Sequence, residues 1–211
     1  MTMNYNEQID LVFEQFENGD IEEATKLLQE IGNHINPGDE DYADYQLNAA
    51  YIYAADNHFD KARESLNNLL NSEDAEEQQM AYHQLGLVER MDAEFDQSIA
   101  YFKKEAELID ANFSDDTIKR SVNLYELGYV QLLNNQYDEG KASLEASLKL
   151  AEQSEDDLSI AISNRALGEL YAAQEEMDKA KSYFTEAKRY FRKDGDDMGV
   201  AEIEALEAAI F

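Results

Sequence analysis

Residues 167–180 read LGELYAAQEEMDKA, and this stretch decides the fold. Gly168 and Ala180 are small residues twelve positions apart, and polar residues lie between them. The flanking apolar residues recur three and four positions apart, which is typical of amphipathic helices. A small residue in each of two antiparallel helices lets their axes approach closely. The stretch therefore predicts a tight helical hairpin.

The same pattern occurs five times along the chain. The second small residue of each copy is Ala24, Ala62, Ser98, Gly140 or Ala180, and these are separated by 38, 36, 42 and 40 residues. Each lies twelve residues after Val12, Ala50, Gly86, Gly128 or Gly168. Because five copies in register are hard to obtain by chance, the sequence predicts an array of repeated hairpins.

The composition favours helix throughout. The 211 residues include a single proline, Pro37, and no segment keeps the alternation of a half-buried strand. We therefore predict an all-α fold. First helices are expected at 5–18, 41–56, 76–92, 116–134 and 158–174, and second helices at 21–34, 59–71, 95–110, 137–153 and 177–193. A last helix, about 198–210, carries Val200, Ile203, Leu206 and Ile210 at helical spacing and is expected to cap the array.

The repeated pattern resembles the tetratricopeptide repeat family. The third copy carries Tyr82, Leu85, Gly86 and Phe102, and the fifth carries Leu167, Gly168, Tyr171, Ala180 and Phe184. The resemblance implies a right-handed α-solenoid of about five hairpins plus a C-terminal capping helix, forming one domain over residues 1–211. The repeats would span about 5–38, 41–74, 76–113, 116–156 and 158–195. The chain departs from the family in having no Trp and units longer than the usual ~34 residues. In length the units resemble those of bacterial peptide-sensing and adaptor tetratricopeptide proteins.

The charge excludes several partner classes. Asp and Glu number 47 against 17 Lys and Arg, a formal net charge of -30. Such a chain repels nucleic acid and anionic membrane, so we expect neither as a partner. We expect protein or peptide partners, basic or of mixed charge. The absence of Cys and of a long apolar run favours a cytoplasmic protein that is neither exported nor membrane-spanning.

Catalytic and metal-binding patterns are missing from the sequence. The three histidines, His34, His58 and His83, fall on three different hairpin elements, and none forms an i, i+4 pair. No glycine-rich phosphate loop is present, and with 47 acids a pair of carboxylates at any spacing arises by accident. We therefore expect no catalytic residue, no metal and no cofactor, and a protein that is not an enzyme.

The connections between successive hairpins are rich in acidic residues. They include Asp41, Asp74, Asp116, Asp156 and Asp196, each near the start of an expected helix. Carboxylates there accept hydrogen bonds from unsatisfied backbone N–H groups and complement the helix dipole. Helix capping explains these acids without a ligand.

A candidate binding surface follows from the helical period of the first helices. One arc of each first helix packs within its hairpin, and the opposite arc faces a shared concave surface. That arc is rich in aromatic and polar side chains, which are typical of peptide-binding hot spots. The candidate peptide-binding residues are Asn48, Tyr51, His83, Gln84, Leu87, Arg90, Tyr125, Tyr129, Arg165 and Glu169.

Alternatives remain for several of these residues and for the function. Leu87 can serve helix packing, His83 can be structural, and Arg90 or Arg165 can pair internally with Glu126 or Glu169. The main functional hypothesis is a peptide-binding scaffold or adaptor. A second is a sensory regulator whose curvature changes on peptide binding; with no DNA-binding segment before the first repeat, it would act on a partner in trans. A third is self-assembly into a homo-oligomer through Phe13, Phe16 and the terminal faces.

Overall fold

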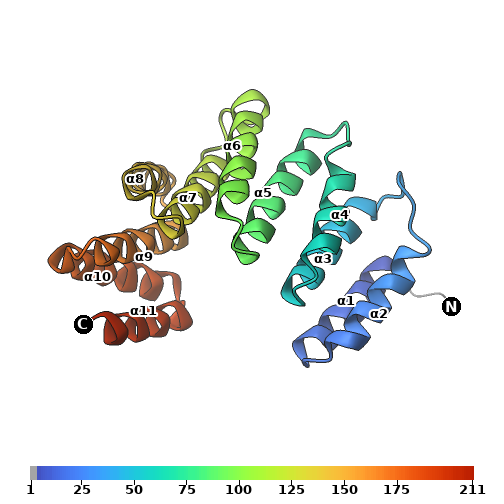
Figure 1. The fold of residues 1–211 in the computed structure, drawn as a ribbon, viewed down its shortest axis with the longest axis horizontal. Helices are drawn as coiled ribbons and strands as arrows, with labels where there is room; N and C mark the ends of the chain where they lie inside the picture. The colour runs from blue at the N-terminus through green and yellow to red at the C-terminus, as the bar shows by residue number, and fades with distance from the viewer. Residues whose placement is uncertain (1–3) are drawn as a thin grey trace. The chain divides into compact units, whose positions relative to one another are not determined.

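The computed structural model describes residues 4–211, and these residues form eleven α-helices and no strand (Figure 1). Each expected helix is present, with its ends within two residues of the predicted ones. The helices are α1 (Tyr5–Glu17), α2 (Ile21–Gly32), α3 (Tyr42–Ala55), α4 (Phe59–Leu69), α5 (Ala75–Met91), α6 (Phe95–Asn112), α7 (Thr117–Leu133), α8 (Tyr137–Ser154), α9 (Asp157–Ala173), α10 (Met177–Asp194) and α11 (Asp197–Ile210). The all-α repeat fold predicted from the sequence is confirmed.

The chain divides into two compact units, one ending at Tyr101 and the other beginning at Phe102. The division falls inside α6. In the first unit, α1 packs on α2 and α3 packs on α4, while α5 lies against α3 and α4. In the second unit, α7 packs on α8, α9 on α10, and α11 on α10.

The turn inside each hairpin has the same backbone conformation in all five copies. One residue has a positive φ: 82° at Gly19, 58° at Asn57, 61° at Ala93, 58° at Asn135 and 62° at Glu175. The next residue's N–H bonds back to the carbonyl five residues earlier, as from Glu94 to Glu89 at 2.8 Å and from Glu176 to Tyr171 at 2.8 Å. This is the Schellman ending of a helix. Because the left-handed residue lies five positions before each repeated small residue, the turn shares the spacing of the repeat.

Small residues bring the paired helices into contact, as the sequence predicts. A Cβ on Gly128 would lie 2.7 Å from Leu144 Cγ and 3.0 Å from the Gly140 carbonyl oxygen. A Cβ on Gly168 would lie 2.6 Å from the ring of Phe184, which is fully buried. In the first unit, the hydroxyl of Ser98 donates to the Gly86 carbonyl at 2.7 Å. Larger side chains at these crossings would separate the helices.

Each unit has its own apolar core. The core of the first unit includes Val12, Leu28, Ile52, Leu66 and Leu85. The core of the second unit includes Leu144, Leu167, Leu170, Phe184 and Ile203. Ile203 and Val200 of α11 are buried, so α11 covers α10 as a terminal helix of a solenoid does.

Four of the five aspartates expected to cap helices do so. Asp74, Asp116, Asp156 and Asp196 each accept a hydrogen bond from a backbone N–H in the first turn of the helix that follows. Asp41 does not, and for this residue the prediction was wrong. Its ψ of 5° is far from the extended conformation of the usual cap residue, so its side chain does not reach the first turn.

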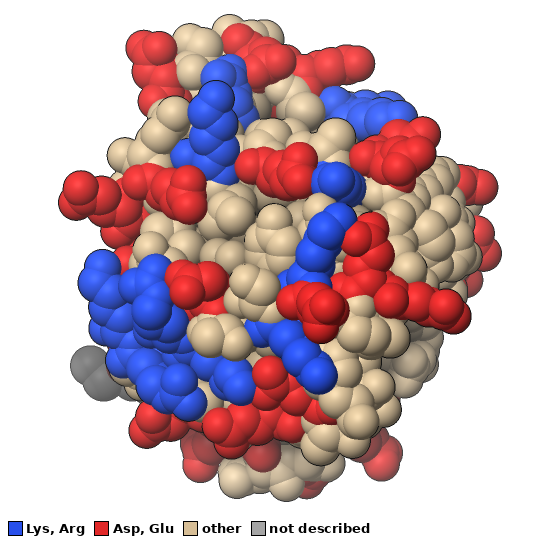
Figure 2. Space-filling model, turned by 90° about the vertical axis from the view of Figure 1, so that its left-hand side faces the viewer, with Lys and Arg blue, Asp and Glu red and all other residues tan. Residues whose placement is uncertain are grey.

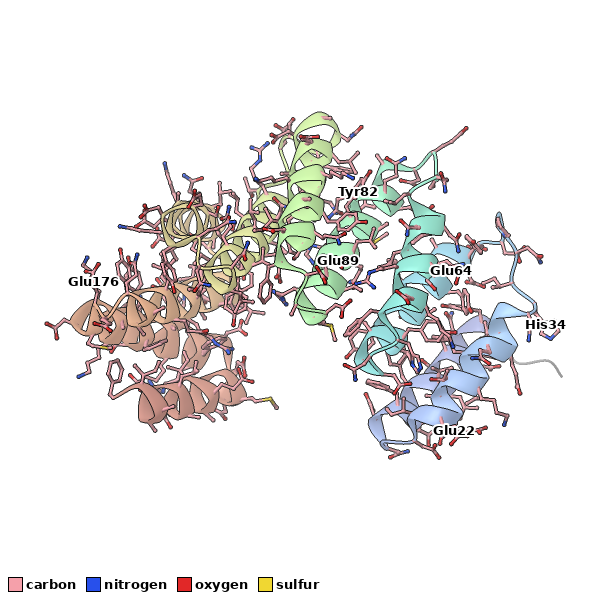
Figure 3. All side chains as sticks on the ribbon, in the orientation of Figure 1. Glu22, His34, Glu64, Tyr82, Glu89 and Glu176 are labelled. Carbon is pink, nitrogen blue, oxygen red and sulfur yellow. The ribbon has the colours of Figure 1, made fainter. Side chains whose placement is uncertain are left out.

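The first unit contains a network of charged side chains around one buried carboxylate, that of Glu89. Glu89 of α5, labelled in Figure 3, is only 1% exposed. Arg63 of α4 donates to both of its carboxylate oxygens, at 2.9 Å from Nε and 2.8 Å from Nη2. Arg63 also contacts Asp92 and lies 3.1 Å from Asp60. The hydrogen bond with Glu89 is the main cause that raises the pKa of Arg63, so this guanidinium stays charged.

Several basic residues of α10 form ion pairs with acids on neighbouring helices. Lys188 pairs with Glu207, Arg192 Nη2 lies 3.6 Å from Glu204, and Lys193 lies 2.7 Å from Asp157. Figure 2 shows Lys and Arg atoms lying among Asp and Glu atoms on one face of the molecule. These pairs join α10 to α9 and α11, which accounts for the cluster of positive charge on one helix.

Candidate functional site

Four of the predicted residues form a connected row in the second unit. The rings of Tyr125 and Tyr129 on α7 are stacked, with centroids 6.0 Å apart and planes 11° from parallel. The Tyr129 hydroxyl donates to Glu169 Oε2 of α9 at 3.3 Å. Glu169 also accepts a hydrogen bond from Arg165 Nε, one turn away on α9, at 3.1 Å. The predicted residues of α7 and α9 therefore share one surface.

The row continues onto α11. Arg165 Nη1 lies 2.7 Å from Glu202 Oε2, so the guanidinium bridges two carboxylates, Glu169 and Glu202. Of the two alternatives for Arg165, the internal pair with Glu169 is present. Glu202 was not predicted. A signal for it existed, because Ala208 lies forty residues after Gly168, as Gly168 does after Gly128. With α11 treated as a sixth first helix, Glu202 falls on the same arc as Arg165.

Glu169 is the more buried of the two acids in the row. Burial raises the pKa of Glu169, while its contacts with Arg165 and Tyr129 act against the rise. Its side chain is 20% exposed and that of Arg165 is 29% exposed. Both groups therefore reach the surface, although neither is fully hydrated. An arginine with two carboxylates leaves a net negative charge beside the tyrosine pair.

The first unit carries the other six predicted residues. Asn48 of α3 donates from Nδ2 to the Tyr5 hydroxyl of α1 at 3.2 Å. Tyr51, also on α3, is 51% exposed and contacts Phe13 and Phe16 of α1. From the sequence, both phenylalanines were expected to serve self-assembly and were not among the ten candidate peptide-binding residues. Partly buried positions on α5 hold His83, Gln84, Leu87 and Arg90.

The ten predicted residues thus fall into two groups, six in the first unit and four in the second. Within each group, side chains of neighbouring first helices meet, through Tyr5 and Asn48 in one unit and through Tyr129 and Glu169 in the other. We call these surfaces the first-helix faces of unit 1 (α1, α3 and α5) and unit 2 (α7, α9 and α11). A groove that runs through both units remains a prediction.

Residues 4–211 contain neither a metal-binding cluster nor a membrane-spanning helix. No group of three or more His, Cys, Asp or Glu side chains in this range is arranged to hold a metal ion. No helix in the same range combines the length and apolar character needed to cross a membrane.

Part of this hairpin array matches a known protein family. Residues 120–193, which include all of α8 and α9 and most of α7 and α10, match the tetratricopeptide repeat family. This segment carries tetratricopeptide repeats. Comparison of the sequence with curated proteins finds no match.

Solved structures share this tetratricopeptide repeat fold at low sequence identity. The apo form of RapI has a TM-score of 0.79 at 16% identity, over 99% of this chain and 78% of that one. A Podosopora anserina kinesin light chain with nearly identical TPR-like repeats has a TM-score of 0.73 at 16% identity, over 92% and 99%. A STAND signal transduction ATPase from Pyrococcus horikoshii has a tetratricopeptide repeat sensor. Its TM-score is 0.74 at 20% identity, over 93% of this chain and 31% of that one. At these identities the likeness establishes the fold alone.

Proposed function

We propose that this chain is a non-catalytic, cytoplasmic scaffold or adaptor that binds a protein segment or peptide on its first-helix faces. The repeat fold supports a role in protein interaction in general, because stacked hairpins present extended surfaces for binding. The observation that carries the finer proposal is the row on unit 2, in which hydrogen bonds and ion pairs join α7, α9 and α11 through Tyr129, Glu169, Arg165 and Glu202.

The tyrosine pair supplies the main contact area in this proposal. Tyr125 and Tyr129 are partly buried and stacked on each other, so binding costs little side-chain entropy. Tyrosine offers a large apolar face with one polar tip, which is why it is common at binding hot spots. We expect an apolar side chain of the ligand to lie against this pair.

Polar groups on the same faces would align the ligand backbone. Asn48 and Gln84 in unit 1 each have an amide that donates and accepts hydrogen bonds. Arg165, Glu169 and Glu202 in unit 2 are already paired, so they would contact a ligand through their outer edges or through water. His83, Leu87, Arg90 and Tyr51 complete the proposed contact set. The net charge of -30 would speed the approach of basic partners and lose its effect as salt rises.

The test begins with peptides selected by phage display on the intact chain at low salt. Their affinities are then measured by fluorescence anisotropy for the wild type and for Tyr125→Ala/Tyr129→Ala. We expect the double variant to weaken binding by about 2 kcal/mol or more, close to thirtyfold, as for paired hot-spot aromatics. Tyr190→Ala, on the second helix α10, is the control and should bind as the wild type does. Unchanged affinity in the double variant, with its helical circular dichroism intact, would refute the proposal.

A further inference from the structure

An aromatic cluster lies on the first-helix face of unit 1. It consists of Phe13 and Phe16 of α1 and Tyr51 of α3. The Tyr51 ring centroid lies 6.2 Å from that of Phe13 and 5.8 Å from that of Phe16, the latter edge to face. Phe13 and Phe16 are partly buried, whereas half of Tyr51 is exposed. The cluster therefore offers ring faces to solvent on a rigid helical support.

This cluster differs from several rings of the protein in its lack of an internal cation. Elsewhere, lysine and arginine side chains of the chain itself lie over aromatic rings. Lys61 lies 5.1 Å from the Tyr53 ring, Lys179 4.8 Å from Tyr171, and Arg189 4.0 Å from Tyr190. Within residues 4–211, no Lys or Arg lies over Phe13, Phe16 or Tyr51. The chain thus supplies cations to several of its rings but not to these.

The surroundings of the cluster are strongly negative. Residues 1–58 contain 13 Asp and Glu residues and a single Lys or Arg, Lys26, which pairs with Glu23 on α2. Asp10 and Glu17 lie one turn to either side of Phe13 on α1 and are exposed, and across residues 4–211 neither has a Lys, Arg or His partner. The pKa of Tyr5, on the same face, is raised by burial and also by the charges of Asp44 and Asp41. The negative potential therefore extends over this face.

We propose that the aromatic cluster of Phe13, Phe16 and Tyr51 binds the cationic side chain, arginine above all, of a basic peptide segment. The inference rests on the proposed peptide-binding function and names the ligand chemistry at one end of that surface. An aromatic ring attracts a cation to its face, and nearby carboxylates add to the attraction. Arginine suits the cluster better than lysine because its planar guanidinium stacks on a ring and loses less hydration.

The negative charge of this face also excludes an acidic peptide as the ligand. An acidic peptide would meet Asp10, Glu17 and Asp44 with only Lys26 to offset them in α1 to α3. A purely apolar ligand would gain contact area but nothing from these carboxylates. A basic peptide that carries apolar side chains gains from both, so it is the occupant to which the observations commit.

The experiment uses the intact chain and two synthetic peptides. The first is acetyl-Ala-Leu-Arg-Leu-Ala-amide, and the second replaces arginine by citrulline, which keeps the shape and removes the charge. NMR titration of isotope-labelled protein reports both the affinity and the location of binding. At low salt we expect the arginine peptide to bind at least about threefold more tightly and to shift the Tyr51 ring signals.

Two double variants test the rings and the local charge. Phe16→Leu/Tyr51→Leu keeps apolar volume but removes two of the three rings, and it should lower the affinity ratio of the arginine peptide to the citrulline peptide. Asp10→Asn/Glu17→Gln should weaken binding of the arginine peptide. Its matched control is Glu22→Gln/Glu30→Gln, which changes the net charge equally on α2, where Glu22 is labelled in Figure 3. The control should weaken binding less.

The outcomes separate this inference from the proposed function. Equal affinity for the two peptides, shifts confined to other residues, or an unchanged arginine preference in the leucine variant would each overturn the inference. The proposed function would still stand if phage-selected peptides lost affinity in Tyr125→Ala/Tyr129→Ala. Loss of affinity for the arginine peptide in the leucine variant, with no effect of the Tyr125/Tyr129 change on selected peptides, would instead move the binding site to unit 1 alone.

Discussion

Replacement of Arg63 by methionine would leave a buried carboxylate without its counter-ion. Arg63 makes two hydrogen bonds to Glu89, whose side chain is 2% exposed, and also contacts Asp92. Methionine keeps the length and apolar stem of the arginine but supplies no hydrogen bond. Glu89 would then remain beside Asp92, with no cation between the two.

The expected loss is large for a single substitution. Removal of one member of a buried ion pair typically costs about 3–5 kcal/mol, because the remaining charge is desolvated and unpaired. Replacement of both charged groups removes that penalty. Arg63→Met/Glu89→Leu should therefore be more stable than Arg63→Met, although it has lost more hydrogen bonds.

Urea unfolding followed by circular dichroism measures this difference. A loss of this size lowers the midpoint of the affected transition by roughly 1–5 M urea. Asp60→Ala is the control, since the Asp60 side chain is fully exposed although it also lies 3.1 Å from Arg63. Its midpoint should move far less than that of Arg63→Met, because an exposed acid in the first turn of a helix contributes only about 0.3–1 kcal/mol. The reasoning would be wrong if Arg63→Met lost less than about 1 kcal/mol, or if the double variant were no more stable than the single one.

Three further predictions concern packing, turn geometry and pH. Gly168→Ala should destabilise unit 2 by about 1–3 kcal/mol despite the better helix propensity of alanine, because the new Cβ would meet the buried Phe184 ring at 2.6 Å; an unchanged unfolding midpoint would contradict this. Ala93→Gly should stabilise unit 1 by about 0.5–1 kcal/mol, since glycine relieves the positive φ of 61°, and a lower thermal midpoint would count against that strain. Glu169→Gln tests how the stability of the fold depends on pH. Burial raises the pKa of Glu169 in the folded state. The stability that protonated Glu169 contributes is therefore present at acid pH and is lost as the pH rises through the raised pKa. Relative to Glu169→Gln, the wild type should therefore gain stability between pH 7 and pH 5 in urea titrations, and a relative loss would refute the direction.

Much of the fold could be predicted because the repeat depends on residues that are close together in the sequence. Small residues twelve apart predicted the close crossings now seen at Gly128 with Gly140 and at Gly168 with Phe184. Aspartates before helices predicted caps, and four of the five discussed above act as caps. Asp41 fails because its cap role depends on a backbone angle, and the loop before α3 sets that angle. The side-chain type alone did not reveal it.

The candidate site was less predictable than the fold. The helical period correctly placed Tyr125, Tyr129, Arg165 and Glu169 near one another, because residues on one arc of adjacent helices share a surface. It did not reveal Glu202 as the second partner of Arg165, because α11 had been treated only as a cap. Nor did it reveal that Phe13 and Phe16 meet Tyr51 across two helices.

The sequence by itself determined the helices, their pairing into hairpins and the arc of each first helix that faces away from its partner. These follow from spacing along one chain, since propensity, caps and small residues act over a few turns. Only the tertiary structure decided which charges are paired and which rings remain uncovered by a cation. Such contacts join residues tens of positions apart, as Arg63 with Glu89 and Arg165 with Glu202, and they depend on distances of a few ångströms that no local pattern encodes.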